Sequence, residues 1–382
     1  MEREELEAWL RLTLSDGVGN SSVRRLLACF GLPEAIFAQP AAVLAQLVSA
    51  SQAQTLQRRP AALDTLLETT WAWLREGCDG NGAQRHVCVL GDARYPPALL
   101  DIEDPPVLLY MLGQLPPQGL PPAHDCIAMV GSRNPTPQGA DNAQALARQL
   151  HQAGLTVVSG MALGVDGAAH TGALDATPCH ESALATIAVI GTGVDILYPS
   201  RHKQLSHAIT QRGLVISEYP MGTPPLPINF PKRNRIIAGL CCGTVVVEAA
   251  LQSGSLITAR LAAEQGRDVF ALPGSIHSPQ SRGCHALIKQ GAKLVESAQD
   301  ILEELRRPAN LAQVPVDPGS ALASADDTAL LRAIGHDPVG LDAMLARTGL
   351  ALSVLQAQLM VLELDGLVVR LPGGLFQRVA ST

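Results

Sequence analysis

Short, nearly continuous apolar runs alternate with amphipathic segments between residues 126 and 305. Strands that are apolar on both faces and separated by helices are typical of a parallel sheet covered by helices on both sides. This pattern predicts a doubly wound α/β domain whose ligand lies at the carboxyl ends of the strands. The apolar runs are CIAMVG, LTVVSG, TIAVIG, LVISEY, GTVVVEA and DVFALPG, and the helices that follow them are predicted at 138–153, 166–175, 201–212, 233–240, 255–265 and 284–290.

The segment before this domain has a different pattern. Apolar residues recur at helical spacing from Leu6 to Phe30, which predicts a helical domain over residues 1–80. The turn SDGVGNSS, with expected N-cap serines, is typical of a helix-hairpin-helix, whose second helix can hold a phosphate on its free amides. The alternative is a helical bundle that only packs or contacts a partner, and the acidic character of the segment favours it. Residues 81–125 are expected to be connecting strands and a Pro-rich linker.

A second Pro-rich linker, 306–326, precedes a C-terminal unit at 327–382. Three helices followed by a hairpin with Gly373 and Gly374 at its tip make this unit a predicted winged helix. Its third helix, SVLQAQLMVLEL, contains no Lys or Arg, so we expect it to bind a protein or a neighbouring domain rather than duplex DNA. The three helices are predicted at 328–334, 341–347 and 353–364.

Composition narrows the class of protein. Of 382 residues, 47% are hydrophobic and 16% charged, which favours packed domains over disorder. No apolar run is long enough to span a bilayer and the N-terminus is acidic, so we expect a cytoplasmic protein. The eight cysteines lack C-x-x-C and Cys/His ligand spacing, so we expect neither a metal site nor a disulfide framework. Although the net charge is −7, residues 201–293 hold 11 basic against 4 acidic residues, and an anion is expected to bind there.

Glycine or serine ends almost every strand of the middle domain, and cations and aromatic residues follow closely. Glycines allow close backbone approach, helix N-termini favour phosphate, and arginines beside aromatic rings suit single-stranded nucleic acid. The alternative is that the arginines pair with Glu218 and Glu248 and that the aromatic rings are core residues. The expected ligand-contacting residues are Gly131, Ser132, Arg133, Ser159, Gly160, Gly164, Arg201, Lys203, Phe230, Lys232, Arg233, Asn234, Arg235, Ser253, Gly254 and Ser255.

The series GSR, SGMALGVDGAAH, GTGVDILYP, SEYPMGTPP, FPKRNRIIAGL and SGSLITARLAAEQGRDVFALPG resembles the DNA-processing protein A family (DprA, also called Smf) over about 126–305. The resemblance implies an extended Rossmann-like fold, an N-terminal sterile-alpha-motif-like domain and a C-terminal winged helix. It further implies a homodimer that binds single-stranded DNA without strong sequence preference and loads the RecA recombinase during natural transformation. It does not imply catalysis. The basic pocket of the family falls on Arg133 and on Lys232 to Arg235.

The chain departs from the family pattern in two places. The family commonly has a lysine after the Tyr-Pro of the third loop, where this chain has Ser200, and we hypothesise that Arg201 or Lys203 restores the charge. The segment TPCHESALA at 177–185 is longer than the usual Gly-rich turn and is expected to be a surface loop.

Enzyme chemistry has weaker support in the sequence. The fingerprint G-x-G-x-x-G and a Walker A lysine are both missing, so we expect no nucleotide cofactor. Asp166 and His170 share a helical face, but Asp166 is where an N-cap is needed, and Cys284-His285 diverge on a helix. Ser253 and Ser255 fit an N-cap and phosphate-binding hydroxyls better than nucleophiles. The run GTVVVEAALQSGS keeps one alternative open, a phosphoribohydrolase of the lysine-decarboxylase-like superfamily acting on a nucleotide.

Overall fold

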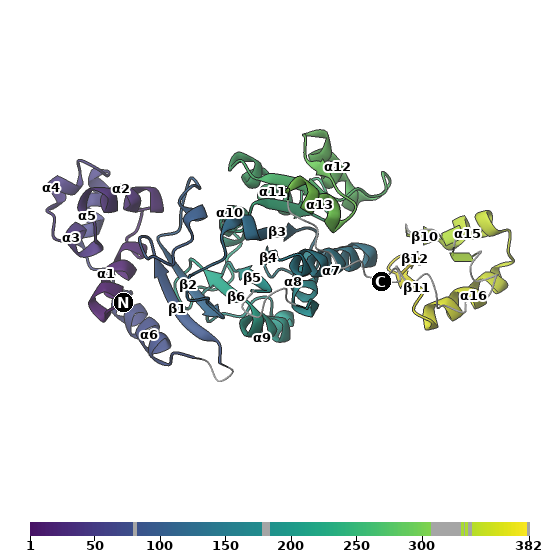
Figure 1. Cartoon of the computed structure of the whole chain (residues 1–382), viewed down its shortest axis with the longest axis horizontal. Coiled ribbons are helices and arrows are strands. Elements are labelled where there is room, and N and C mark those ends of the chain that lie inside the picture. The colour runs from purple at the N-terminus through teal and green to yellow at the C-terminus, as the bar shows by residue number, and fades with distance from the viewer. Residues whose placement is uncertain (79–81, 178–183, 307–329, 332, 335–337, 380–382) are drawn as a thin grey trace.

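The computed structural model describes residues 1–78, 82–177, 184–306, 330–331, 333–334 and 338–379 (Figure 1). It has a large mixed sheet with helices on both faces, a helical N-terminal segment and a small C-terminal winged helix domain. The predicted fold class is therefore confirmed. Parts of three predicted segments lie outside the described residues. They are residues 307–326 of the predicted linker, residues 328, 329 and 332 of the predicted helix 328–334, and residues 178–183 of the inserted segment 177–185.

The large sheet has nine strands in the order β1-β2-β6-β5-β4-β3-β7-β8-β9. From β6 to β9 all neighbours are parallel, whereas β1, β2 and β6 pair antiparallel. Chain order reverses between β3 and β7, so the topological switch point of the sheet lies there. The strands are β1 (Gln84–Val89), β2 (Leu108–Gly113), β3 (Cys126–Val130), β4 (Thr156–Ser159), β5 (Thr186–Val189), β6 (Leu214–Ser217), β7 (Gly243–Val246), β8 (Asp268–Ala271) and β9 (Lys293–Leu294).

Helices cover both faces of the parallel strands, as the apolar runs predicted. One buried cluster joins α7, α8 and α13 to one face through Ile127 and Met129, and another joins α10, α11 and α12 to the opposite face through Ala128 and Val130. The alternation of side chains along β3 therefore fills two separate cores. The helices are α7 (Pro137–Gln152), α8 (Val165–Asp175), α9 (Lys203–Arg212), α10 (Asn229–Gly239), α11 (Ser255–Glu264), α12 (Arg282–Lys289) and α13 (Ala298–Glu304).

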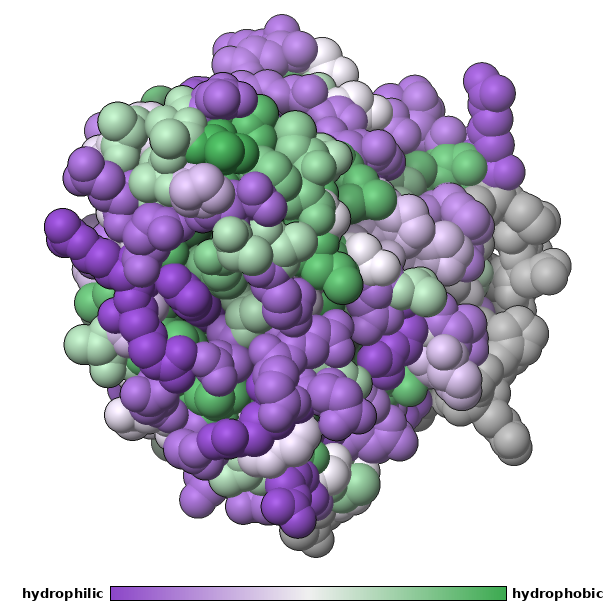
Figure 2. Space-filling model, turned by 90° about the vertical axis from the view of Figure 1, so that its left-hand side faces the viewer, coloured by the Kyte–Doolittle hydropathy of each residue, from purple (hydrophilic) through white to green (hydrophobic). Residues whose placement is uncertain are grey.

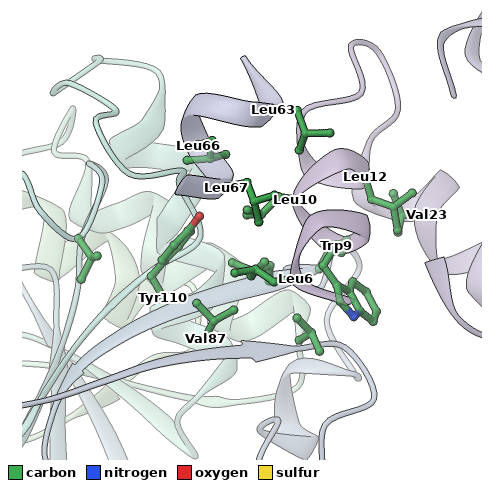
Figure 3. Close-up of a cluster of buried hydrophobic side chains, with 14 of the residues drawn as sticks. Leu6, Trp9, Leu10, Leu12, Val23, Leu63, Leu66, Leu67, Val87 and Tyr110 are labelled. Carbon is green, nitrogen blue, oxygen red and sulfur yellow. The ribbon is translucent and has the colours of Figure 1, made fainter. Parts of the chain in front are cut away.

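The N-terminal helices share a core with the edge of this sheet. Figure 3 shows Leu6 and Leu10 of α1 beside Leu67 of α6, with Val87 of β1 and Tyr110 of β2 closing the same cluster. The strands in the segment expected to connect domains thus extend the sheet, because β2 pairs with β6. The helices are α1 (Arg3–Thr13), α2 (Asn20–Phe30), α3 (Pro33–Phe37), α4 (Ala41–Leu44), α5 (Ala50–Gln57) and α6 (Leu63–Arg75).

The expected serine N-caps at the turn before α2 are wrong. The N-cap is Gly19, which offers no side-chain cap, and Ser22 lies buried inside the helix where its Oγ accepts a hydrogen bond from Arg25. Figure 2 shows this end of the molecule, where hydrophilic side chains predominate and hydrophobic ones are gathered in patches. Whether the segment binds phosphate or only contacts a partner stays a prediction.

The winged helix domain has its own apolar core. It comprises β10 (Val339–Gly340), α15 (Leu341–Thr348), α16 (Leu352–Leu364), β11 (Val368–Leu371) and β12 (Leu375–Arg378). Gly373 and Gly374 form the hairpin tip with φ of +85° and +73°, as the double glycine predicted. Among the described residues no single helix is long and apolar enough to cross a membrane; α15 and α16 reach that apolarity only together, across a bend of 109°.

Candidate functional site

A cleft of about 660 Å³ opens at the carboxyl ends of β3 and β7. Its walls are the loop after β3 (131–134), the loop after β7 (250–255) and the start of α10, with Pro225 and Pro227 at one side. This is the switch point of the sheet, where the two loops diverge to opposite faces and leave a crevice. The cleft therefore lies where the strand pattern predicted a ligand.

Arg133 supplies an exposed cation to the cleft. Its guanidinium carbon lies 6.0 Å from the centroid of the Phe230 ring. In the described part of the chain no carboxylate lies within ion-pair distance of this guanidinium. An exposed guanidinium without a carboxylate partner keeps its donors for an anion.

Arg233 forms the floor of the same cleft and is buried. Its guanidinium donates to the carbonyl oxygen of Gly160 (2.8 Å) and to that of Val189, at the ends of β4 and β5. Burial lowers the pKa of Arg233 to about 10; the carboxylate of Asp166 raises it in part, and the charge of Arg133 lowers it further. Two like charges thus face one cleft, and an anion between them would relieve their repulsion.

Two aromatic rings stand at the mouth of the cleft. The centroids of Tyr198 and Phe230 are 5.5 Å apart with an interplanar angle of 40°. Tyr198 is 45% exposed although it is a large aromatic residue, and Phe230 is half-buried. These rings are not core residues, and they offer a planar apolar face beside the two arginines.

The run Lys232 to Arg235 does not act as one basic pocket in this structure. Arg233 and Asn234 line the cleft, whereas Lys232 is exposed outside it and Arg235 is buried behind it. The guanidinium of Arg235 forms an ion pair with the carboxylate of Glu218. For this arginine the structure therefore shows the alternative that the sequence left open, pairing with a carboxylate of the chain. The physical reason is helical geometry: α10 begins at Asn229, and consecutive residues on a helix point in different directions.

The glycines of the strand ends serve packing more than ligand approach. Gly164 has φ of +82°, and a Cβ there would lie 2.4 Å from the carbonyl oxygen of Ser132. A Cβ at Gly160 would overlap the guanidinium of Arg233, and the amide of Gly160 already donates to Asp166 (3.2 Å). The glycines therefore let the loops after β3 and β4 pack against each other beside the cleft.

Serines of the expected site differ in their access. Ser159 is fully buried and its hydroxyl donates to the carbonyl oxygen of Met129 (2.6 Å), so the structure does not place it on the surface of the cleft. Ser253 and Ser255 line the cleft at the N-terminus of α11, with their Oγ atoms 2.7 Å apart. The N-cap of α11 is Gly254 rather than Ser253, and the helix start adds partial positive charge to this wall.

Gly131 and Ser132 line the cleft as expected. By contrast, Arg201 lies exposed in the 3-10 turn before α9 and Lys203 lies exposed at the start of α9, and neither lines the cleft. The family commonly has a lysine where this chain has Ser200, and the hypothesis that Arg201 or Lys203 restores that charge stays a prediction. Sequence reasoning missed several lining residues, because single amides and prolines carry no periodic signal: Asn134, Pro225, Pro227, Gln252, Thr258 and Gln280.

The groups considered for acid or base chemistry have structural partners. The carboxylate of Asp166 accepts hydrogen bonds from the amides of Gly160 and Ala162, so it holds the loop after β4 and is not the N-cap, which is Gly164. Burial raises the pKa of Asp166. His170 is fully buried with Nδ1 2.6 Å from the hydroxyl of Thr186, and burial lowers its pKa to about 3.

Glu248, the acidic residue of the GTVVVEA run, also has partners. Its carboxylate accepts from the amide (2.9 Å) and the hydroxyl (2.6 Å) of Thr136, the N-cap of α7. Burial raises the pKa of Glu248. Cys284 is buried and the neighbouring His285 lies 3.1 Å from the carbonyl oxygen of Gly274, so the two side chains form no dyad. Among the described residues no group of three His, Cys, Asp or Glu is placed to hold a metal ion.

Comparison with known proteins agrees with the fold and identifies a family. The family described as DNA recombination-mediator protein A matches residues 86–306, and the DprA winged helix domain matches 314–374. Protein Smf of Escherichia coli is 39% identical over 81% of this chain and 80% of its own length, and DNA processing protein DprA of Streptococcus pneumoniae is 49% identical over 56% and 72%. The X-ray structure of the S. pneumoniae protein has a TM-score of 0.58 at 36% identity, covering 80% of this chain and 98% of that one.

Proposed function

Because the chain belongs to the DNA recombination-mediator protein A family, we propose that it binds single-stranded DNA in the cleft between β3 and β7. The observation that carries this proposal is the convergence of an exposed arginine, a helix N-terminus and two aromatic rings on one crevice. Each of these groups matches a different part of a nucleotide strand. No step of the proposal requires bond making or breaking.

The backbone phosphate is assigned to the cationic part of the cleft. Arg133 provides donors without a carboxylate partner, and the buried charge of Arg233 strengthens the attraction from below. The hydroxyls of Ser253 and Ser255 and the start of α11 face the same space. Arg201, Lys203 and Lys232 lie exposed outside the cleft and would attract more distant phosphates through solvent.

The bases are assigned to the aromatic mouth. A ring that is half-exposed beside a phosphate site can stack on any base, because every base has a π-face. Stacking needs bases that are not already paired within a duplex. We therefore expect binding to prefer single strands and to depend little on sequence.

The biological setting follows from the family resemblance. We propose that the protein delivers the bound strand to the RecA recombinase, as a homodimer, in the cytoplasm and during natural transformation. The description of the family as a recombination mediator supports this step. It is tested by strand exchange with RecA on DNA covered by single-strand-binding protein, where adding the chain should shorten the lag.

The hydrolase alternative makes a different prediction. An enzyme of that kind would turn over a nucleoside monophosphate and would bind a polymer weakly. We expect instead that labelled oligothymidine binds the full chain, that unlabelled oligothymidine competes, and that a duplex of equal length or thymidine monophosphate does not. Release of free base from nucleoside monophosphates, with weak oligothymidine binding, would favour the hydrolase.

A further inference from the structure

The loop after β3, residues 131–136, carries Arg133 to the cleft, and hydrogen bonds fix the residues on either side of it. The carbonyl oxygen of Ser132 accepts from the amide of Val165 (3.1 Å), and the hydroxyl of Ser132 accepts from the amide of Asn134 (3.1 Å). These contacts fold the loop on itself and attach it to the start of α8. The direction of the exposed Arg133 side chain therefore depends on where this loop is held.

Glu248, at the end of the run GTVVVEA, holds the far end of this loop. It lies two residues past the end of β7, and the contact of β3 with β7 continues nearly to it, because the amide of Val247 donates to the carbonyl oxygen of Val130 (3.1 Å). Both oxygens of the Glu248 carboxylate are used: one accepts from the amide of Thr136 (2.9 Å) and the other from its hydroxyl (2.6 Å). A Cβ at Gly139 would lie 2.4 Å from the carboxyl carbon of Glu248, so the first turn of α7 leaves room for this carboxylate.

A second contact holds the middle of the loop. The side-chain amide of Gln280 donates to the carbonyl oxygen of Asn134 (3.2 Å), the residue next to Arg133. The backbone of Gln280 is fixed in turn, because its carbonyl oxygen accepts from the amide of Ala249 (2.7 Å), the residue after Glu248. Two points of the loop that carries Arg133 are thus attached to the segments that follow β7 and β8.

Electrostatics alone does not explain a carboxylate at this place. Glu248 does not line the cleft, but it contacts the loop that supplies the cation of the cleft, and its charge repels a phosphate there. Burial also raises the pKa of Glu248, because the charged form loses solvation. Removing the charge and removing the hydrogen bonds to Thr136 therefore have opposite expected effects on phosphate binding.

We propose that Glu248 and Gln280 are positioning residues for Arg133, because they hold the loop after β3 so that the guanidinium faces the cleft. Glu248 acts through Thr136 without touching DNA, and Gln280 acts through Asn134. The inference rests on the proposed binding of single-stranded DNA. It gives the acidic residue of GTVVVEA a role in holding a loop rather than in chemistry on a nucleotide.

The affinity of the full chain for labelled oligothymidine, measured by fluorescence anisotropy, separates positioning from charge. Glu248→Ala removes the hydrogen bonds and the charge, and it should weaken binding about fivefold. Glu248→Gln removes the same charge but keeps an acceptor for the Thr136 amide, so it should bind closer to wild type. If the carboxylate only repels phosphate, both variants bind more tightly than wild type, and that result would overturn the proposal.

Asp268→Asn is the matched control for the loss of charge. Asp268 is exposed at the first residue of β8, so it lies at the amino end of the parallel strands, opposite to the cleft. This variant should bind like wild type, because solvent and salt screen a charge at that distance. Weakening equal to that of Glu248→Ala would assign the effect to net charge and overturn the positioning role.

A double-mutant cycle shows whether the two residues act through Arg133. Glu248→Ala and Gln280→Ala should each weaken binding in the wild-type background and change it little in the Arg133→Ala background. Each should also make the salt dependence shallower, because a displaced guanidinium no longer contacts the phosphate. A general loss of structure, or a direct contact of Gln280 with DNA, would instead weaken binding equally in both backgrounds and overturn the proposal.

Two further comparisons complete the test. Thermal unfolding reports whether each variant is folded at the assay temperature, and if Glu248→Ala is not, the half-buried Gln280 decides the question through Gln280→Ala. Equal affinity of Arg133→Ala and wild type would overturn the proposed DNA site and this inference with it. Weak binding by Arg133→Ala, with wild-type affinity of the folded Glu248 and Gln280 variants, would overturn the positioning role alone.

Discussion

Arg235 and Glu218 form a two-pronged ion pair behind the cleft, with Nη1–Oε1 at 2.7 Å and Nη2–Oε2 at 2.5 Å. The Nε atom of the same guanidinium donates to the carboxylate of Asp104 (3.1 Å), which also accepts from the side chain of Asn20 (3.2 Å). One arginine therefore links α10 with the end of β6, the loop after β1 and the start of α2. Its sequence position suggested a ligand contact, but its geometry gives it a structural role.

Arg235→Ala should accordingly destabilise the protein. Removing one partner of a buried ion pair leaves Glu218 buried and unpaired, which costs about 3–5 kcal/mol. The control is Lys232→Ala, three residues earlier on the same helix but exposed, which should stay within about 0.5 kcal/mol of wild type. Urea unfolding at neutral pH measures both. Similar free energies of unfolding for the two variants would contradict the structural role.

Tyr198→Ala should weaken oligothymidine binding without changing its dependence on salt. Loss of a stacking ring costs about 1–3 kcal/mol, at least a fivefold rise in the dissociation constant, whereas no phosphate contact is removed. Tyr198→Phe keeps the ring and should bind like wild type. Fluorescence anisotropy over a salt series measures both effects. Equal affinity of the alanine and phenylalanine variants would argue against stacking at Tyr198.

Gly164→Ala should disturb both stability and binding. Only glycine readily adopts φ of +82° with ψ of −128°, and the new Cβ would collide with backbone atoms of Ser132 and Arg133. The dihedral strain alone costs about 1–3 kcal/mol, and relief of the clash would displace Arg133. Gly254→Ala is the control, since its φ is −62° and a Cβ there meets open space. Equal midpoints of thermal unfolding for Gly164→Ala and Gly254→Ala would contradict the predicted strain at Gly164.

Stability should fall in mild acid because of His170. Its pKa is about 3 in the folded chain and about 6.5 when exposed, so the unfolded chain binds the proton more tightly. The stabilisation is complete above pH 6.5 and is lost as the pH falls toward 3, by up to about 1.4 kcal/mol per pH unit. His170→Asn should flatten this part of the profile, measured as urea unfolding at several pH values. If the pH profile of the free energy of unfolding is the same in the variant as in wild type, the loss of stability in acid does not come from His170 and the prediction is wrong.

The sequence predicted the sheet well because each strand of the middle domain is apolar on both faces, and such short apolar runs are typical of parallel strands covered by helices on both sides. It also placed the cleft, since carboxyl ends of parallel strands meet at one edge. It could not separate Arg233 from Arg235, because that requires the start of α10, which lies at Asn229 rather than near 233. Nor could it find Gln280 as a residue of the cleft. The side-chain amide of Gln280 donates a hydrogen bond to the carbonyl oxygen of Asn134, although the two residues are 146 positions apart in the sequence.

The joining of the N-terminal helices to the sheet was also beyond the sequence. Leu6 and Leu10 show helical spacing, but the pattern does not say that their partners are Val87 and Tyr110. Those partners come from strands that the Pro-rich surroundings suggested were a connector. Long-range pairing of this kind depends on the register of β2 with β6, which no local pattern encodes.

The central claim is that Arg133 binds a phosphate of single-stranded DNA, and the salt dependence of oligothymidine affinity for wild type and Arg133→Ala tests it most directly. If the claim holds, the variant binds about tenfold more weakly at low salt, and the slope of log affinity against log salt becomes shallower by about 0.7, the value for one phosphate contact on a single strand. Its stability should be unchanged because the side chain is exposed. Equal affinity and equal slope for the two proteins would contradict the account.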